Sequence, residues 1–272
     1  MTASHQYLIN GRNDILISPL DRGFAYGDGV FRTLAVRYGL ADHWDRHYRK
    51  LVEDCNVLGI VCPAAELLLA DIGHLFTRDE QAVAKIMITR GEGARGYALP
   101  ALAQPTRVVV KTALPEYPAV NFSKGVSLHL CRLRLAHQPE LAGIKHLNRL
   151  ENVLARMEWT DSAVADGLML DQLDNVIECT MGNLFARFDC TLLTPDLSLC
   201  GVAGITRQLI LELVPALGYQ ASIAHLSLSE LMQADEIVIC NSLYGAWQVR
   251  ELNNQRWPPS DLAERLRQKI QG

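Results

Sequence analysis

The segment Leu141-Ala142-Gly143-Ile144-Lys145-His146-Leu147-Asn148-Arg149-Leu150-Glu151 decides how the chain is interpreted, because it sets a lone lysine among apolar and small residues. An ammonium group has a reference pKa near ~10.4, and desolvation favours its neutral form. A neutral lysine is a nucleophile that can form a Schiff base with an aldehyde. The alternative is a lysine whose stem lies on apolar surface while its ammonium reaches water. The other motifs of the chain decide between the two.

Four further segments accompany the lysine segment along the chain. They are residues 21–33, 178–185, 201–207 and 234–241. Together the five segments resemble the fold type IV pyridoxal-phosphate enzymes, the family of the branched-chain and D-amino acid aminotransferases. The resemblance implies an α/β fold, with an α+β N-terminal domain, a mixed α/β C-terminal domain and the active site between the domains. It also implies pyridoxal 5′-phosphate as the cofactor and a homodimer.

Length and composition are those of a globular enzyme. The 272 residues suit one large or two modest domains, and a hydrophobic content of 49% is enough to bury substantial cores. A polar, proline-containing stretch at residues 115–125 predicts a linker. We therefore expect an N-terminal domain of residues 1–114 and a C-terminal domain of residues 126–272.

Charge and cysteine content exclude several classes of protein. A net charge of −4 and a pI near 6.1 give no electrostatic footprint for nucleic acid. Apolar runs are too short to span a membrane, and the first residues lack the features of a signal peptide, so we expect a cytoplasmic protein with no membrane partner. The seven scattered cysteines form no Cys-x-x-Cys pair, which predicts neither a disulfide framework nor a thiolate zinc site.

Two short motifs lack the context that their function would need. Residues 91–96 fit the dinucleotide-binding pattern Gly-x-Gly-x-x-Gly, but Tyr97-Ala98-Leu99-Pro100 is a poor helix start and no βαβ unit follows. His43 and His47 have the spacing of metal ligands one helical turn apart, but no glutamate stands beside them. We therefore predict surface histidines and no metal site.

Apolar periodicity predicts an antiparallel sheet with two helices in the first half of the chain. Two hairpins are expected, one joining residues 6–10 to 15–18 and one joining 30–38 to 40–43. The predicted helices of this half span residues 46–58 and 64–76, and the further strands span 82–90 and 106–112.

The second half alternates short strands with helices. The predicted strands are residues 167–170, 176–179, 184–188, 191–194, 221–225 and 236–240. The predicted helices are residues 149–162, 204–217 and 258–270, the second of them ended by Gly218.

The resemblance assigns chemical roles to Lys145 and Glu178. Lys145 would carry the cofactor and act as the base of the reaction. Glu178 would keep the pyridine nitrogen protonated, so that electrons released from the substrate flow into the ring. Without the surrounding segment, Glu178 would be interpreted as an exposed carboxylate at the end of a strand.

A phosphate site is expected where a helix starts. The backbone amides of Gly204, Ile205 and Thr206 suit an anion, because the first N–H groups of a helix are unpaired and lie at the positive end of its dipole. Val202 matches a family position that packs on the cofactor ring, although it would also suit a plain core. Ser242 is a further candidate donor to the phosphate.

The chain departs from the family in the residue expected to pair with the phosphate. The family usually presents an arginine from a His-x-x-Arg-Leu segment, whereas His47-Tyr48-Arg49-Lys50-Leu51 places Lys50 there. Lysine binds phosphate as a point charge and lacks the bidentate fork of arginine. Arg46, four residues before Lys50 on the same helix face, is the alternative.

Two reactions of the family remain open at this stage. The lysine segment is similar to the form found in the lyases, which implies β-elimination from 4-amino-4-deoxychorismate to give 4-aminobenzoate and pyruvate in folate synthesis. The alternative is transamination of branched-chain or D-amino acids. Thr33 occupies a position where the lyases carry a hydroxyl, although threonine is also common in strands. Arg90 is the expected partner of a substrate carboxylate, followed by Arg95 and Tyr97.

Overall fold

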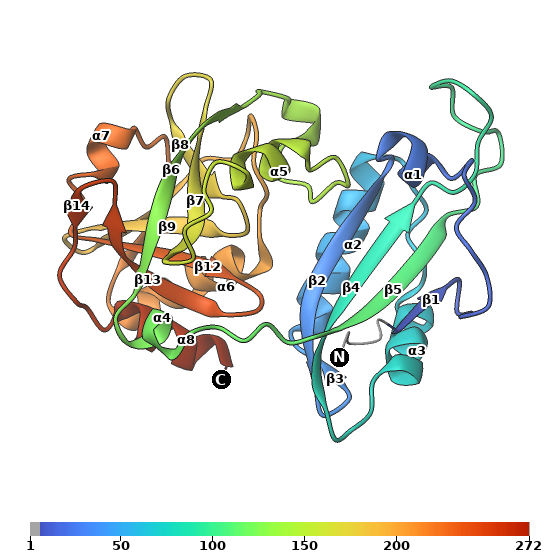
Figure 1. Ribbon diagram of the computed structural model, residues 1–272, viewed down its shortest axis with the longest axis horizontal. Coiled ribbons are helices and arrows are strands. Elements are labelled where there is room, and N and C mark those ends of the chain that lie inside the picture. Colours follow the sequence, from blue (N-terminus) through green and yellow to red (C-terminus); the bar gives the residue numbers. More distant parts are fainter. Residues whose placement is uncertain (1–5, 272) are drawn as a thin grey trace. The chain divides into compact units, whose positions relative to one another are not determined.

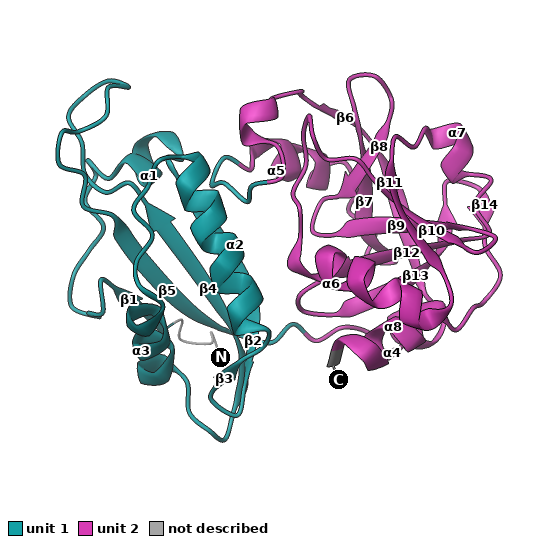
Figure 2. Ribbon diagram, turned by 180° about the vertical axis from the view of Figure 1, so that it is seen from behind, with its two compact units in different colours: residues 1–115, 144–148 teal, residues 116–143, 149–272 magenta. Residues whose placement is uncertain are grey.

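The computed structural model describes residues 6–271 and divides into two compact units (Figure 2). Unit 1 comprises the chain up to Pro115 together with Ile144–Asn148, and unit 2 comprises Glu116–Gly143 and the chain from Arg149 onward. The segment that contains Lys145 therefore belongs to the N-terminal unit. The domains expected from the sequence are contiguous and do not assign residues 144–148 to the N-terminal part, because periodicity carries no information on which unit a loop joins.

An antiparallel five-stranded sheet with the order β1-β5-β4-β2-β3 forms the body of unit 1 (Figure 1). Its core lies on one face, where even-numbered residues such as Leu34 and Ile86 pack with Leu51 and Ile72 of two helices. The strands are β1 Gln6–Ile9, β2 Gly29–Arg37, β3 Leu40–Ala41, β4 Gln81–Thr89 and β5 Thr106–Ala113, and the helices are α1 Arg22–Tyr26, α2 Trp44–Val57 and α3 Ala65–Leu75.

The helices and strands predicted for the first half are confirmed, with one exception. The hairpin around Gly39 forms, with φ of 77° at the glycine and β2 paired to β3. The strand expected at residues 15–18 is wrong, because these residues join no ladder. Leu16 in this stretch is 85% exposed, so strand pairing there would bury little apolar surface. β1 pairs with β5 instead, with Gln6 opposite Lys111.

A mixed nine-stranded sheet organises unit 2, with the order β11-β10-β9-β12-β13-β6-β7-β8 and with β14 beside β13. Its strands are labelled in Figure 2. The pairs β10–β11, β13–β6 and β6–β7 are parallel. The strands are β6 Val126–Leu135, β7 Val164–Asp171, β8 Val176–Cys179, β9 Asn183–Phe188, β10 Thr191–Pro195, β11 Gln220–Ala224, β12 Glu236–Asn241, β13 Gly245–Leu252 and β14 Gln255–Arg256.

Two helices of unit 2, α6 and α8, pack against this sheet. Phe185 of β9 and Val238 of β12 share a fully buried cluster with Ile210 and Leu266. These two residues lie on α6 and α8, so α6 is held against β9 and β12. The helices are α4 Ala119–Ser123, α5 Leu150–Arg156, α6 Ile205–Leu213, α7 Leu228–Leu231 and α8 Leu262–Gln271, with 3-10 turns η1 Pro139–Leu141 and η2 Val214–Leu217.

The strands predicted for the second half are confirmed, but the helices are shorter than predicted. The helix expected at residues 149–162 ends at Arg156, and beyond it the Asp161 side chain accepts the Ala163 N–H at 2.8 Å, a turn that competes with helix. Pro215 lacks an N–H, so α6 gives way to a 3-10 turn that ends at Gly218 as expected. Strands β6 and β13 were not predicted, and α4 occupies the expected linker.

Neither unit relies on a covalent cross-link. All seven cysteines are free, and Cys190 is the exposed one among them. The buried apolar clusters therefore supply the main stabilisation. Within residues 6–271, no helix combines the length and the apolar character that a bilayer crossing requires.

Candidate active site

Lys145 is held by its backbone on two sides within unit 1. Its N–H donates to Oδ2 of Asp54 at 3.1 Å, and its carbonyl oxygen accepts the Phe31 N–H at 2.9 Å. The side-chain Nζ lies 4.8 Å from the centroid of the Phe31 ring. The amine is therefore placed over a defined side chain of β2 by contacts that its own backbone makes.

A glycine permits the close approach of the lysine segment to β2. The Leu147 N–H donates to the carbonyl of Gly29 at 2.9 Å. A Cβ added at Gly29 would lie 2.8 Å from Cδ1 of Leu147 and 2.5 Å from the carbonyl oxygen of Ile88. A side chain at this position would collide with the β4 backbone at Ile88, and the Leu147 side chain would also have to move.

Asp54 brings three donors to one buried carboxylate. Its side chain is fully buried, and Oδ1 accepts the Lys50 ammonium at 2.6 Å. Oδ2 accepts Nη2 of Arg32 as well as the Lys145 N–H. Burial lowers the pKa of the Arg32 guanidinium, and the Asp54 carboxylate opposes that shift. The lysine segment thus rests on a buried ion pair.

Both candidates for pairing with a phosphate lie on α2. The Lys50 ammonium is 2.6 Å from Asp54 and 3.9 Å from Glu53, so its charge is already paired within the fold. Arg46 lies one helical turn earlier and is half-buried. The choice between Lys50 and Arg46 stays a prediction.

Thr33 shares a face of the sheet with the lysine amine. It follows Phe31 by two residues on β2, so both side chains point away from the face that α2 and α3 cover. The register sets Thr33 opposite Lys85 of β4. The Lys85 Nζ lies 5.1 Å from the Phe31 centroid. Two amines therefore lie near one aromatic ring, on the face of β2 that also carries Thr33.

Arg90 is bound within the fold of unit 1. Its Nε and Nη2 donate to the Asp28 carboxylate at 2.8 and 3.0 Å. Nη1 and Nη2 also donate to the carbonyls of Gly59 and Leu58 at 2.9 and 2.6 Å. Binding a substrate carboxylate through Arg90 would require opening this pair.

The two weaker candidates from the same loop are accessible. Arg95 is exposed, and Tyr97 is 84% exposed with its ring 5.4 Å from the ring of Tyr26. Arg22 donates to the carbonyls of Gly96 and Tyr97 at 3.1 and 3.4 Å, which anchors the loop backbone while leaving these two side chains at the surface.

Glu178 lies at the end of β8 in unit 2 and is only 4% exposed. The interpretation of an exposed strand-end carboxylate is therefore wrong. Its Oε2 accepts the backbone N–H of Val202 at 2.8 Å, a bond that compensates part of the cost of burying a charge. Val202 is itself 7% exposed.

The start of α6 carries a set of donors in unit 2. Gly204 is the N-cap of the helix and has no side chain, so it offers no side-chain acceptor to the first N–H groups, which include those of Ile205 and Thr206. The Thr206 hydroxyl lies 3.4 Å from the Ser242 hydroxyl. Backbone amides and two hydroxyls at a helix start are the donors that an anion prefers.

Asn183 ties the α6 start to the loop that holds Glu178. Its Nδ2 donates to the Val202 carbonyl at 2.8 Å, and its Oδ1 accepts the Gly204 N–H at 3.1 Å. A Cβ added at Gly204 would lie 2.4 Å from this Oδ1, so the contact requires glycine. One side chain therefore fixes both ends of the loop.

Three of these residues were not singled out by the sequence. Asp54 follows Lys50 by four residues on a predicted helix, a spacing that would have suggested an ion pair. Asn183 stands inside one of the five segments, but its role depends on a loop that comes later in the chain. Lys85 had no sequence signal, because only strand register sets it opposite Thr33.

His47 differs from the prediction of a surface histidine. It is 3% exposed, since α2 begins at Trp44 and places His47, Leu51 and Asp54 on the buried face of the helix. Its Nδ1 has no hydrogen-bond partner among residues 6–271. Burial, reinforced by the charge of Arg32 and of other nearby cations, lowers the pKa of His47 to about 3.

Comparisons with known proteins identify the family. The family described as amino-transferase class IV matches residues 29–252. An aminodeoxychorismate lyase from Vibrio harveyi is 36% identical over 96% of this chain and 97% of its own. The crystal structure of 4-amino-4-deoxychorismate lyase from Pseudomonas aeruginosa is 45% identical, covers 98% of both chains and has a TM-score of 0.93.

A more distant structure shares the fold. The pyridoxal-phosphate-bound form of a hypothetical aminotransferase from Mycobacterium tuberculosis is 21% identical, covers 94% of this chain and 92% of its own, and has a TM-score of 0.78. The chain therefore belongs to the amino-transferase class IV family and has the fold of the type IV enzymes. The family and the fold class predicted from the five segments are confirmed.

Protonation of His47 should destabilise the folded protein in mild acid. The unfolded chain takes up this proton near pH 6.5 and the folded protein only near pH 3, so stability is lost as pH falls through that window. Between pH 7 and pH 5 the wild type should lose about 2 kcal/mol more than His47→Gln. Urea unfolding at both pH values measures this difference. His74→Gln, which changes an exposed histidine of α3, is the control and should behave like the wild type. Equal pH sensitivity of wild type and His47→Gln would contradict the prediction.

Proposed function

We propose that this protein is a pyridoxal-phosphate-dependent lyase that converts 4-amino-4-deoxychorismate to 4-aminobenzoate and pyruvate in folate biosynthesis. The observation that carries the proposal is the placement of the Lys145 amine and the Thr33 hydroxyl on the Phe31 face of β2. The two relatives described as such lyases support it, because their similarity extends over nearly the whole chain.

The residues present fit pyridoxal 5′-phosphate. This cofactor requires an amine to attach its aldehyde, a carboxylate beside its pyridine nitrogen and donors for its phosphate. Lys145 supplies the amine and the buried Glu178 the carboxylate. The first turn of α6 and the Thr206 hydroxyl supply phosphate donors, at a helix start whose N-cap is Gly204. A cation for the phosphate comes from Lys50 or Arg46 on α2.

Each residue has a defined task in the reaction. The bound cofactor supplies an electron sink for charge released at the amine-bearing carbon of the substrate. Glu178 holds a proton on the pyridine nitrogen. The Lys145 amine removes the proton from the amine-bearing carbon, and the Thr33 hydroxyl donates to the departing enolpyruvyl oxygen. The bond between the substrate ring and the enolpyruvyl oxygen is cleaved, which releases pyruvate and leaves an aromatic ring. Because the amine stays on the ring, no keto acid is consumed.

The substrate carries two carboxylates, and both need partners. We assign them to Lys85, Arg95 and Tyr97, because the donors of Arg90 are engaged by Asp28 and two carbonyls. Lys85 stands opposite Thr33, which would set a cation beside the hydroxyl that assists the leaving group.

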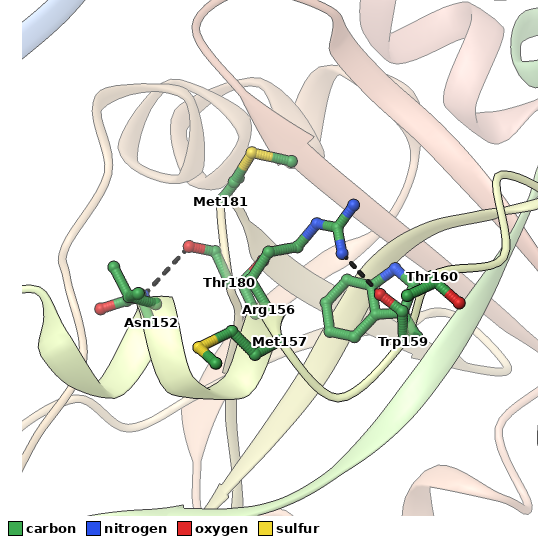
Figure 3. A pocket seen from close by; sticks show the side chains of 8 residues that line it. Asn152, Arg156, Met157, Trp159, Thr160, Thr180 and Met181 are labelled. Atoms are coloured by element: carbon green, nitrogen blue, oxygen red, sulfur yellow. Dashed lines mark hydrogen bonds between the residues drawn. The ribbon is translucent and has the colours of Figure 1, made fainter.

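We also propose that the enzyme acts in the cytoplasm as a homodimer. Seven free cysteines are typical of a reducing compartment. Unit 2 displays an apolar stripe at helical spacing, in which Leu150, Val153, Leu154 and Met157 are 74%, 51%, 53% and 72% exposed. The stripe adjoins a cavity of about 560 Å³ whose lining includes Trp159 and Met181 (Figure 3). A second copy of this face would bury the stripe in a two-fold contact.

The reaction itself can be separated from transamination. Supplied alone, 4-amino-4-deoxychorismate should give equal amounts of 4-aminobenzoate and pyruvate, whereas D-alanine or leucine with 2-oxoglutarate should give far slower glutamate formation. Chromatographic assay of the products measures both. Thr33→Val should lower the lyase rate by about 100-fold, because it removes a proton donor. Thr112→Val, on β5 of the same sheet, is the control and should leave the lyase rate unchanged. Rapid glutamate formation without 4-aminobenzoate would show an aminotransferase instead.

Substitutions of Lys145 and of Glu178 should impair the enzyme at different steps. Lys145→Ala should abolish turnover, because both the attachment point and the base are lost. Glu178→Gln should still bind pyridoxal phosphate but lower kcat at least ~100-fold, since the amide keeps the shape and loses the charge. Glu236→Gln is the control, because Glu236 is a buried carboxylate of unit 2 that pairs with Arg187 and Ser260. Absorbance titration and steady-state rates report the result, and near-normal kcat in Glu178→Gln would remove this residue from the mechanism.

The dimer should depend on the exposed stripe of α5. Val153→Glu combined with Met157→Glu should weaken self-association at least ~10-fold, because two charges would be buried at the contact. Sedimentation velocity over a concentration series measures the dissociation constant. Leu102→Glu, at a residue 91% exposed in unit 1, serves as the control. A wild type that sediments as a monomer, or a variant as dimeric as the wild type, would exclude this surface.

A further inference from the structure

The Asp54 carboxylate lies at the centre of the residues that position Lys145. It accepts one backbone N–H, from Lys145 at 3.1 Å, and two cationic groups, from Lys50 and Arg32. The three donors come from the lysine segment, from α2 and from β2. Asp54 is therefore the point at which three separate parts of unit 1 are joined.

Burial makes this arrangement demanding. The side chains of Asp54 and Arg32 are 0% and 3% exposed, so removal of the carboxylate would leave a buried guanidinium without its counter-charge. Lys50, whose side chain is 16% exposed, would also be released from its nearest carboxylate. Both cations would then have to move toward solvent or toward another anion, and the lysine segment would lose the acceptor of its N–H.

The lysine amine depends on the same contacts. The Lys145 peptide is held between Asp54 on one side and the Phe31 N–H on the other. Arg32 follows Phe31 directly, so the Arg32–Asp54 pair also fixes the strand residue over whose ring the amine lies. Loss of the Asp54 carboxylate would therefore disturb both the Lys145 backbone and the Phe31 ring over which the amine lies.

We propose that Asp54 is a positioning residue, which sets the Lys145 backbone and orients Lys50, so that the amine can attach pyridoxal phosphate. The inference rests on the proposed function for the cofactor and for Lys145 as its attachment point. Both oxygens of Asp54 are already engaged by Arg32, Lys50 and the Lys145 N–H, so Asp54 acts through Lys145 and Lys50.

The test compares the buried Arg32–Asp54 pair with the partly buried Arg107–Asp71 pair of the same unit. Asp54→Asn removes the charge, and Arg32→Gln with Asp54→Asn removes the pair as a whole, so that no buried charge is left alone if the single variant folds poorly. Arg107→Gln with Asp71→Asn is the matched control, because Arg107 donates to the 4% exposed Asp71 at 2.6 and 3.3 Å in the same unit. Melting temperature is measured for all variants to compare their folding.

Three readouts are required. Absorbance titration with pyridoxal phosphate gives the cofactor Kd, and borohydride reduction followed by peptide mapping gives the fraction of label on Lys145. Steady-state rates separate kcat from KM. Both Asp54 variants should raise the cofactor Kd at least ~10-fold, lower the labelled fraction of Lys145 and lower kcat more than they change KM. The Asp71 control should keep the wild-type Kd and labelling even where its melting temperature falls.

Different results would contradict the positioning role of Asp54, the proposed function or both. A Kd and labelling within twofold of wild type in both Asp54 variants, or an equal loss in the Asp71 control, would overturn the positioning role. Wild-type protein that binds no pyridoxal phosphate would overturn it together with the proposed function. Wild-type protein that is labelled at Lys145 but forms no 4-aminobenzoate would refute the lyase alone, while the expected Asp54 effects on binding would still support this inference.

Discussion

The two hydrogen bonds that hold the Lys145 backbone, to Asp54 and to Phe31, are the contacts on which the rest of the candidate site depends. A lysine side chain has four rotatable bonds, so its amine is placed reliably only when its backbone is fixed and its stem has a surface to lie on. Asp54 and the Phe31 N–H fix the backbone, and the Phe31 ring provides the surface. These residues are far apart in the chain and are brought together in unit 1, which includes Ile144–Asn148.

In unit 2 a single loop plays the corresponding part. The Val202 N–H donates to Glu178, while the Val202 carbonyl and the Gly204 N–H are both bound by Asn183. The position of the carboxylate and that of the α6 amides are therefore coupled. A change that shifts this loop would disturb the pyridine partner and the phosphate donors together, so mutational effects at these residues are not expected to add.

Local charge matters more than net charge for the chemistry proposed here. The whole chain carries a formal charge of −4, yet the Phe31 face of β2 gathers the amines of Lys145 and Lys85. A dianionic substrate is attracted by a local cation such as the Lys85 ammonium. Unit 2 contributes neutral donors and one buried carboxylate, the set that suits a cofactor carrying a protonated ring nitrogen and a phosphate.

The sequence by itself determined the family, the fold class and most of the helices and strands. Five segments carried the resemblance, and apolar periodicity was enough to find elements whose buried face repeats regularly, such as α2, β2 and β4. It failed where burial and not local pattern decided the outcome. Residues 15–18 are apolar enough for a strand but join no sheet. Histidine is often a surface residue, but His47 lies on the buried face of α2.

Only the tertiary structure decided how the candidate residues are supported. The engagement of Arg90 by Asp28, the pairing of Arg32 with Asp54 and the place of Lys85 opposite Thr33 all follow from strand register and from the packing of segments that are far apart in the chain. A sequence records which side chains are available, and periodicity shows which of them face a core. Which distant groups then compensate a buried charge is set by packing, because that cost is met only when all partners have been brought into place.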